Sequence, residues 1–284
     1  MRFIDWLRKI LGPPTTPPPK PLPEVEKDLA YGPDPLQKLD VYRPAGMVEG
    51  QTAPAIDMTH GGGWQNDKGD KANAGVIDNK LAHYLALGYI VVSGNYRLWT
   101  ETNGITPADE AQDVARKLAF VQKLPGVDPK RVTLMGHSAG GNLVAQVGAS
   151  VELQSAYGYL SPAKIVCLDA VYDIPKAIKA ANATGNKQAI SLYKPFGADP
   201  AVQRMGSPTY SVSAPMPPCF LAYSTQEGPG RKSQADGFAA AIVKNGGPQP
   251  VVQGFDLSHG DMDAMVGLPG PLTDAVDGFV RGLG

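Results

Sequence analysis

Residues 131–140 read RVTLMGHSAG, an apolar run followed by the pattern G-x-S-x-G, and a helical pattern continues directly after it. Residues 132–135 predict a buried strand, and residues 140–150 predict a helix. A sharp turn between strand and helix would lift the serine hydroxyl above the sheet, and Gly136 and Gly140 leave the room that such a turn needs. Ser138 is therefore a candidate nucleophile, and its surroundings predict an α/β fold.

The rest of the chain alternates strand-like and helical patterns on both sides of this turn. Repeated alternation is typical of a mainly parallel central sheet with helices on both faces, in which ligands bind at the carboxyl ends of the strands. The interval 174–210 is far longer than an ordinary connection, and we expect a short lid insertion there, with a surface excursion as the alternative. Strands are predicted at 39–42, 53–58, 89–93, 132–135, 164–168, 219–223 and 250–253, and helices at 76–87, 107–122, 140–150, 176–181, 233–245 and 272–283.

The N-terminal region differs from the rest of the chain. Apolar residues within 1–12 share one helical stripe, which predicts an amphipathic helix, and seven of residues 13–23 are proline, which predicts a stiff linker over 13–26. The remaining residues, 27–284, form the expected catalytic domain. Residues 1–11 could dock on a membrane surface or mediate self-association, or fold back onto the domain. Asp5, Arg8 and Lys9 interrupt the apolar core that a secretory signal needs, so export is not supported and a cytoplasmic location is expected. A monomer or homodimer is expected.

Composition excludes several classes of protein. With 284 residues, 43% of them hydrophobic, the chain is not disordered, and 26 Lys and Arg against 27 Asp and Glu give no positive field for nucleic acid. Cys167 and Cys219 lie in apolar runs and are expected to be buried free thiols. Neither has a partner at metal-ligand spacing, so no metal is expected.

A second glycine motif, HGGGW at 60–64, follows the predicted strand at 53–58. Consecutive glycines expose backbone amides along a turn, which is what an acyl-transfer site needs to hold a developing oxyanion. Gly62, Gly63 and Ala139 are the expected donors. Trp64 and His137, which adjoin the two motifs, are expected to line the substrate pocket.

A serine nucleophile needs a base, and the chain has four histidines. His60 belongs to the glycine turn, His137 is fixed beside Ser138, and His83 lies within a predicted helix. His259 follows the last predicted strand, where a loop can bring its imidazole over the sheet edge. His259 is therefore the expected base.

The third group should be a carboxylate that orients the imidazole, and its expected place in the chain lies between the serine and the histidine. Glu227, just past the strand at 219–223, is the first candidate, and Asp173, past the preceding strand, is the second. Asp236 and Asp256 are less well placed, one within a helix and the other too near His259.

These motifs together resemble the α/β-hydrolase superfamily. The resemblance rests on LDVYRP at 39–44, HGGGW at 60–64, NYRL at 95–98, GHSAG at 136–140 and the late His259, and it covers about residues 27–284. Within the superfamily the chain looks like the carboxylesterases with an H-G-G-G oxyanion loop, which include hormone-sensitive-lipase-like and bacterial feruloyl-esterase-type enzymes.

The resemblance implies Ser138 as nucleophile, His259 as base, an oxyanion hole from Gly62, Gly63 and Ala139, and no cofactor. Glu227 departs from the aspartate that is usual at its position. The resemblance also implies that Arg97 and Asp113 have a structural task, which is to tie the helix ahead of the serine turn to the neighbouring strand.

The expected function is hydrolysis of small carboxylic esters, with short to medium acyl or aromatic groups, through an acyl-enzyme on Ser138. Activity should fall as the pH drops through roughly 6 to 7, where an imidazole becomes protonated. The same three groups would also serve an amide or formamide hydrolase. A non-catalytic binding protein with this fold is the third possibility.

Overall fold

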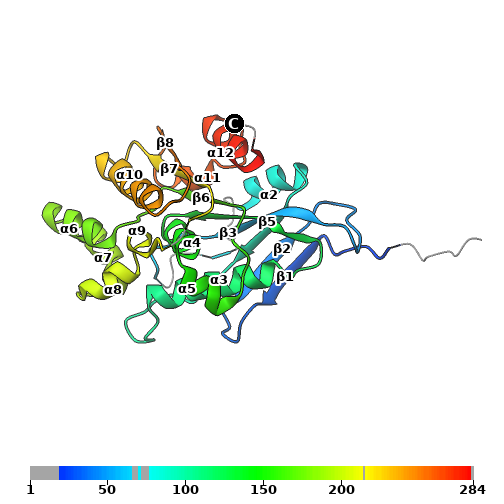
Figure 1. The fold of residues 1–284 in the computed structure, drawn as a ribbon, viewed down its shortest axis with the longest axis horizontal. Coiled ribbons are helices and arrows are strands. Elements are labelled where there is room, and N and C mark those ends of the chain that lie inside the picture. Colours follow the sequence, from blue (N-terminus) through cyan, green and yellow to red (C-terminus); the bar gives the residue numbers. More distant parts are fainter. Residues whose placement is uncertain (1–18, 66–69, 72–76, 214, 283–284) are drawn as a thin grey trace, which may run out of the picture.

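The computed structural model describes residues 19–65, 70–71, 77–213 and 215–282, which form one eight-stranded sheet covered by helices (Figure 1). The N-terminal helix predicted at 1–12 lies outside the described residues. In space the strands follow the order β1-β2-β4-β3-β5-β6-β7-β8. Their bounds are β1 Val25–Ala30, β2 Lys38–Tyr42, β3 Ala53–Thr59, β4 Ile90–Gly94, β5 Val127–His137, β6 Lys164–Leu168, β7 Cys219–Ser224 and β8 Val251–Phe255.

The sheet is mainly parallel, as the sequence predicts. Strands β3 to β8 all pair in parallel, whereas β2 pairs antiparallel with both β1 and β4. The predicted boundary of the Pro-rich linker at residue 26 is wrong, because Pro21 forms a bridge with Val48 and β1 already begins at Val25. The described part of that segment is therefore bound to the sheet.

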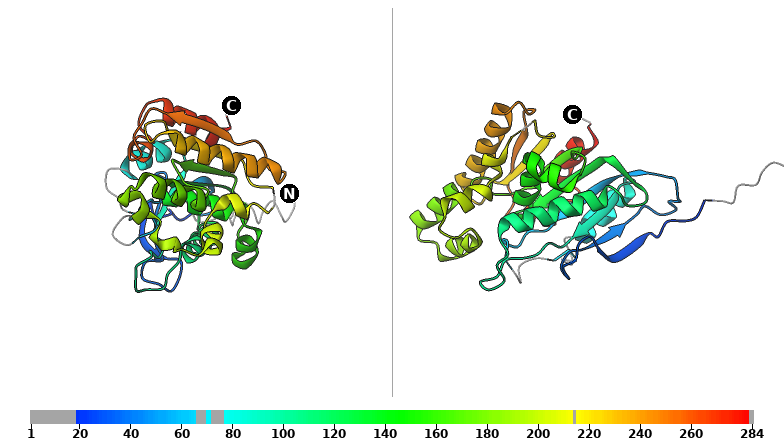
Figure 2. Two further views of the ribbon diagram at one scale, coloured as in Figure 1. Left: turned by 90° about the vertical axis from the view of Figure 1, so that its left-hand side faces the viewer. Right: turned by 60° about the horizontal axis from the view of Figure 1, so that its bottom comes forward.

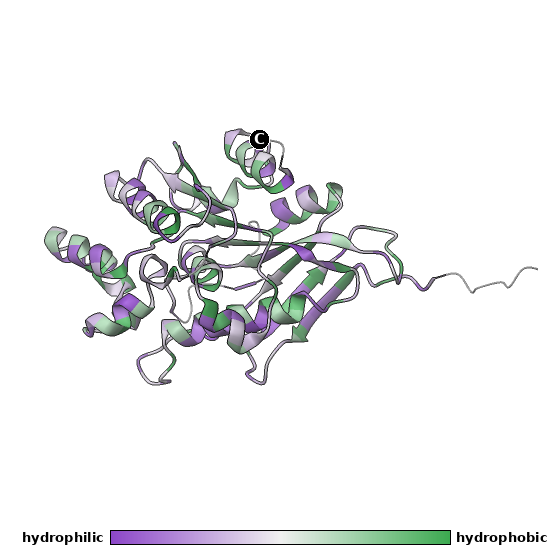
Figure 3. Ribbon diagram, in the orientation of Figure 1, coloured by the Kyte–Doolittle hydropathy of each residue, from purple (hydrophilic) through white to green (hydrophobic). Residues whose placement is uncertain are grey.

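Helices cover both faces of the sheet, so each face has its own core (Figures 1 and 2). On one face pack α3 (Pro107–Val121), α4 (Ala139–Ala149) and α10 (Pro229–Lys244), and on the other pack α2 (Ile77–Ala86), α11 (Asp261–Ala264) and α12 (Pro271–Arg281). A further helix, α5 (Val151–Tyr157), follows α4. Apolar residues concentrate in the strands and on the inward sides of the helices (Figure 3). The predicted buried thiols are confirmed, since Cys167 and Cys219 are free and at most 1% exposed.

Helix α3 shows how local sequence sets an element that supports the site. Its first turn carries a capping box, in which the Thr106 hydroxyl accepts from the Asp109 amide and the Asp109 carboxylate accepts from the Thr106 amide. Pro107 occupies the first turn, where its missing N–H costs no hydrogen bond. From this fixed start, one side of α3 buries Val114 and Leu118 against the sheet.

The long interval between β6 and β7 folds into five short helical elements that extend beyond the carboxyl ends of the strands (Figures 1 and 2). These are α6 (Ile174–Thr184), α7 (Lys187–Leu192), η1 (Lys194–Phe196), α8 (Pro200–Met205) and α9 (Pro208–Ser211). Side chains of Asp173, Asn186 and Asp199 cap the starts of α6, α7 and α8. Of the helices described, none is both long and apolar enough to span a membrane.

Candidate active site

Ser138 stands at the turn between β5 and α4, in the strained conformation that the glycine–serine motif predicts. Its φ of 54° and ψ of −118° are uncommon for a residue with a side chain. The turn is possible because a Cβ at Gly136 would lie 2.3 Å from the Gly140 oxygen, and a Cβ at Gly140 would lie 2.2 Å from the Thr59 oxygen. The Ser138 amide donates to the Leu168 oxygen at 2.9 Å and so fixes the turn to β6.

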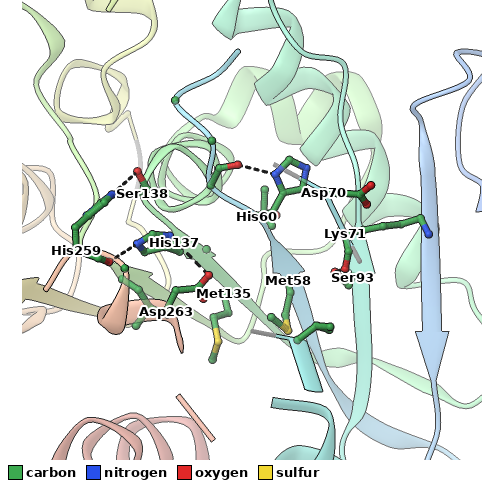
Figure 4. A pocket seen from close by; sticks show the side chains of 18 of the residues that line it. Met58, His60, Asp70, Lys71, Ser93, Met135, His137, Ser138, His259 and Asp263 are labelled. Carbon is green, nitrogen blue, oxygen red and sulfur yellow. Dashed lines mark hydrogen bonds and ion pairs between the residues drawn. The ribbon is translucent and has the colours of Figure 1, made fainter. Parts of the chain in front are cut away.

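His259 reaches Ser138 from the loop that follows β8. Its Nε2 lies 3.0 Å from the Ser138 Oγ, which is hydrogen-bond distance (Figure 4). The structure therefore brings together the two groups that the sequence predicts as nucleophile and base, although 121 residues separate them along the chain.

Asp169 is the carboxylate that contacts the other side of the His259 ring. It follows β6 directly, adopts a φ of 49°, and places its Oδ2 2.5 Å from the His259 Nδ1. Its Oδ1 accepts from the Ser224 amide at 2.9 Å. Burial alone would raise the pKa of Asp169, but the hydrogen bond with His259, the charge of Arg231 and the Ser224 amide together lower that pKa below its usual value. Asp169 is therefore ionised at neutral pH.

The prediction that Glu227 orients His259 is wrong, and so is the second candidate, Asp173. Glu227 is exposed in the loop after β7, and Asp173 instead caps α6 by accepting from the Lys176 amide. The end of β7 serves the acid indirectly, because the Ser224 amide there binds Asp169. Asp169 could have been found as the first polar residue after the buried run at 164–168.

The HGGGW segment packs directly against the serine turn. A Cβ at Gly61 would lie 3.1 Å from the His137 Nδ1 and 3.2 Å from the Ser138 Cβ. Gly62 and Gly63 have φ values of 123° and 66°, which glycine adopts without strain. Among the described residues, none accepts a hydrogen bond from the amides of Gly62, Gly63 or Ala139. Three amides beside the serine thus have no acceptor within the described part of the fold.

His60 stabilises this loop and is a poor candidate base. Its Nδ1 donates to the Gly61 oxygen at 2.6 Å, its ring stacks on Tyr96 with centroids 4.5 Å apart, and the Tyr96 hydroxyl donates to the His60 oxygen at 3.1 Å. Burial lowers the pKa of His60 to about 4, so the ring is neutral at pH 7.

Two ion pairs, each with a buried carboxylate, hold the elements around the loop. The Lys117 ammonium on α3 lies 2.8 Å from Asp57 and donates to the Met58 oxygen at 2.7 Å, which fixes the end of β3 where the glycine loop begins. The Arg97 guanidinium binds Asp113 through Nε and Nη2 at 2.8 and 2.7 Å. This second pair ties α3 to the segment after β4, and the predicted structural task of Arg97 and Asp113 is confirmed.

His137, next to Ser138, holds the backbone of the loop that carries His259. Its Nε2 donates to the His259 backbone oxygen at 2.8 Å, and its Nδ1 lies 3.7 Å from the Asp263 Oδ2 (Figure 4). Burial lowers the pKa of His137, which keeps the ring neutral. Sequence reasoning missed this hydrogen bond, because the motifs predict where the His259 imidazole lies but not which side chain meets the His259 backbone oxygen.

A cavity of about 420 Å³ opens beside Ser138 and His259. His137 lines it as predicted, but Trp64 does not, because Trp64 is 3% exposed and packs edge-on against Phe196 with centroids 4.9 Å apart. Helix α7 of the insertion contributes Gln188 and Leu192 to the wall. The other lining residues are Met58–Gly63, Asp70, Lys71, Ile77, Ser93, Met135, Gly136, Leu168, Gly260 and Asp263.

Comparison with known proteins gives consistent matches. The family model BD-FAE matches residues 39–241. Esterase LipQ of Mycobacterium tuberculosis is 25% identical over 225 residues, which are 76% of this chain and 52% of that protein. A probable isoprenylcysteine alpha-carbonyl methylesterase of Oryza sativa, ICMEL1, is 24% identical over 84% of this chain and 58% of its own length. The chain thus spans about half the length of the curated relatives it matches.

Among solved structures, Thermogutta terrifontis esterase 2 phosphoramylated by tabun superposes with a TM-score of 0.70 and 20% identity. The match covers 95% of this chain and 98% of that one. At this identity the likeness shows a shared fold, which is the α/β-hydrolase arrangement that the motifs predict.

Proposed function

The chain belongs to the BD-FAE family and has the α/β-hydrolase fold, and on that premise we propose that it is a serine hydrolase of carboxylic esters. One observation carries the proposal: Ser138, His259 and Asp169 form a continuous chain of contacts, at 3.0 Å and 2.5 Å, beside a cavity. Hydrolysis by a serine nucleophile needs this order of nucleophile, base and acid. The names of the matched relatives agree with an ester as substrate.

In the first half of the proposed reaction, the Ser138 Oγ attacks the ester carbonyl carbon while the His259 Nε2 takes the hydroxyl proton. Ionised Asp169 stabilises the imidazolium that forms. The carbonyl oxygen becomes an oxyanion, and the amides of Gly62, Gly63 and Ala139 are the donors proposed to bind it. When the tetrahedral intermediate collapses, the alcohol takes the proton from His259 and leaves, and the acyl group stays on Ser138.

In the second half, a water molecule gives its proton to the His259 Nε2 and attacks the acyl carbon. The intermediate collapses, the Ser138 Oγ takes the proton back, and the carboxylic acid leaves.

The cavity of about 420 Å³ has apolar side chains of Met58, Met135 and Ile77 in its wall. Short to medium acyl or aromatic esters fit that volume and chemistry.

The test is substitution of the nucleophile with a matched control. S138A should abolish hydrolysis of p-nitrophenyl esters and labelling by a fluorophosphonate probe, whereas S161A, at an exposed serine, should leave both unchanged. A series of esters from acetyl to octanoyl, with a feruloyl ester, then defines the acyl preference. Retained turnover in S138A would refute the proposal. Turnover of a formamide but of no ester would favour the amide hydrolase, and absence of labelling in the wild type would favour a binding protein.

A further inference from the structure

Arg231, in the first turn of α10, contacts both partners of the acid–base pair, and the proposed reaction gives it no task. Its Nη1 donates to the Asp169 backbone oxygen at 3.2 Å, and its Nε lies 3.4 Å from the Asp169 Oδ2. Its Nη2 lies 3.4 Å from the His259 Nδ1. The side chain is only 21% exposed, so water screens its charge incompletely.

The contact between Arg231 and His259 is not an ordinary hydrogen bond. The Nδ1 of His259 lies 2.5 Å from a carboxylate oxygen, so Nδ1 carries a hydrogen and donates it to Asp169. A guanidinium has only donors, and its Nη2 therefore faces an N–H that cannot accept. Arg231 is held in this position by Asp169, and it places a permanent positive charge against the imidazole.

The other charged groups around His259 do not replace this effect. On the β5 side, His137 is neutral. Asp263 of α11 lies 3.7 Å from His137 and pairs with buried Lys80 of α2 at 2.9 Å, so its charge is offset. Asp261 binds the Ser258 hydroxyl at 2.6 Å and is exposed. Among the residues that the structure describes, the fixed charges in direct contact with the ring are therefore the Asp169 carboxylate and the Arg231 guanidinium.

These two charges have opposite effects on protonation of the His259 imidazole in the resting enzyme. A carboxylate alone would favour the imidazolium, which cannot accept the proton of Ser138. A guanidinium at 3.4 Å disfavours the imidazolium while leaving Asp169 ionised and oriented. We infer that Arg231 is a positioning residue whose charge opposes protonation of resting His259 and so offsets the opposite effect of Asp169. This inference rests on the proposed function of Ser138 and His259.

The experiment compares the pH dependence of R231Q, R231K and the control K232Q. Lys232 is the next residue, 57% exposed and paired with Asp236 one helical turn away, so its change removes one positive charge without touching the site. Two quantities are measured from pH 5 to 9: kcat/KM for a p-nitrophenyl ester, and the rate constant for labelling of Ser138 by a fluorophosphonate. The labelling rate reports on Ser138 and His259 without requiring the right substrate.

In R231Q we expect the acidic limb of both profiles to move up by about one pH unit. Both kcat/KM and the labelling rate constant should then be roughly tenfold lower than in the wild type at pH 5.5 and nearly unchanged at pH 8.5. R231K keeps the charge, so its acidic limb should lie close to that of the wild type. The acidic limb of K232Q should match that of the wild type. If R231Q does not fold by circular dichroism, R231M, which keeps the aliphatic stem, replaces it. A limb that stays in place or moves down in the folded neutral variant overturns the inference.

Failure of the proposed function gives a different pattern. If the wild type hydrolyses no ester but its Ser138 is labelled, the substrate proposal fails while the Arg231 inference is still decided by the labelling rates. If the wild type is not labelled at any pH, both fail. A loss in R231Q that is equal at every pH, with no rescue in R231K, would show a purely structural role and would also overturn the inference.

Discussion

Substitution of Asp169 by Asn separates the acid found in the structure from the acid expected from the sequence. The Asn side chain has nearly the shape of Asp. In the wild type the Ser224 amide donates to the Asp169 Oδ1 at 2.9 Å, and the amide oxygen of Asn can accept the same hydrogen bond. The amide nitrogen then takes the place of Oδ2, which lies 2.5 Å from the His259 Nδ1. Because that nitrogen is a donor, Nδ1 must become an acceptor, and the ring proton moves to Nε2.

A proton on Nε2 faces the Ser138 Oγ across 3.0 Å, so His259 can no longer take the serine proton. The opposite orientation of the Asn side chain is no better, because it turns a buried NH₂ group toward the Ser224 amide. Loss of the correct tautomer lowers kcat by about 10³- to 10⁴-fold in a site of this kind, equivalent to about 4–5.5 kcal/mol in the barrier. We expect D169N to show a loss of this size.

The assay is kcat for a p-nitrophenyl ester, normalised to the folded fraction from circular dichroism. E227Q is the matched control, since it neutralises the exposed carboxylate after β7 and should retain wild-type kcat within about twofold. The reasoning is refuted if D169N keeps more than about a tenth of the wild-type kcat. It is also refuted if E227Q loses as much activity as D169N, because Glu227 would then be the working acid.

Two further substitutions test the serine turn and a buried carboxyl group. In G140A the new Cβ would lie 2.2 and 2.4 Å from the Thr59 and His60 oxygens, so activity should fall by about a hundredfold and stability by about 1–3 kcal/mol. G237A, in open space on α10, should be neutral or stabilising, and equal melting temperatures for G140A and G237A would contradict the argument. Burial raises the pKa of Glu110 well above its usual value, so the folded protein keeps a proton that the unfolded chain loses, and the contribution of Glu110 to stability falls as the pH rises above about 4.5. E110Q lacks this loss, so urea titrations should show its advantage over the wild type growing from pH 4.5 to 7; an advantage that shrinks over this range would contradict it.

Much of the sheet can be predicted from the sequence because most strands are buried on both faces. Strand β6 is predicted with its observed bounds, since its apolar run is flanked by polar residues and turns. The sequence does not predict strand β1, because this edge strand is mostly exposed and its residues, VEKDLA, carry three charges. The short helices α7 and α8 escape prediction for another reason: side-chain caps at Asn186 and Asp199 fix them, and they are too short to show a period.

Some groups of the site can be predicted from local sequence motifs, whereas others depend on tertiary packing. Ser138 and the glycine loop are local motifs, because each needs a backbone conformation that only a few residue types adopt. The position of Trp64 beside the loop predicts that it lines the pocket, but its side chain turns into the core against Phe196. Side-chain direction after a turn depends on tertiary packing, which no local pattern records. The sequence likewise shows Arg231 only as a charged residue four positions after Glu227.

Strand register explains why the acid comes from β6. His137 pairs with Leu168, so the next residues, Ser138 and Asp169, leave the two neighbouring strands at the same level. The imidazole must then arrive from β8, two strands beyond β6, and the loop after Phe255 has to return over the end of β7.

Ser224 at the end of β7 provides both supports for that arrangement. Its amide binds the Asp169 Oδ1 at 2.9 Å, and its hydroxyl donates to the Leu257 oxygen at 2.5 Å. One residue therefore orients the carboxylate and holds the loop that carries His259. A carboxylate on the loop after β7, as at Glu227, would leave β7 beyond this point, where the side chain is exposed and away from the ring. The position of the acid thus follows from how the strands pair, which is why the order of groups along the chain did not reveal it.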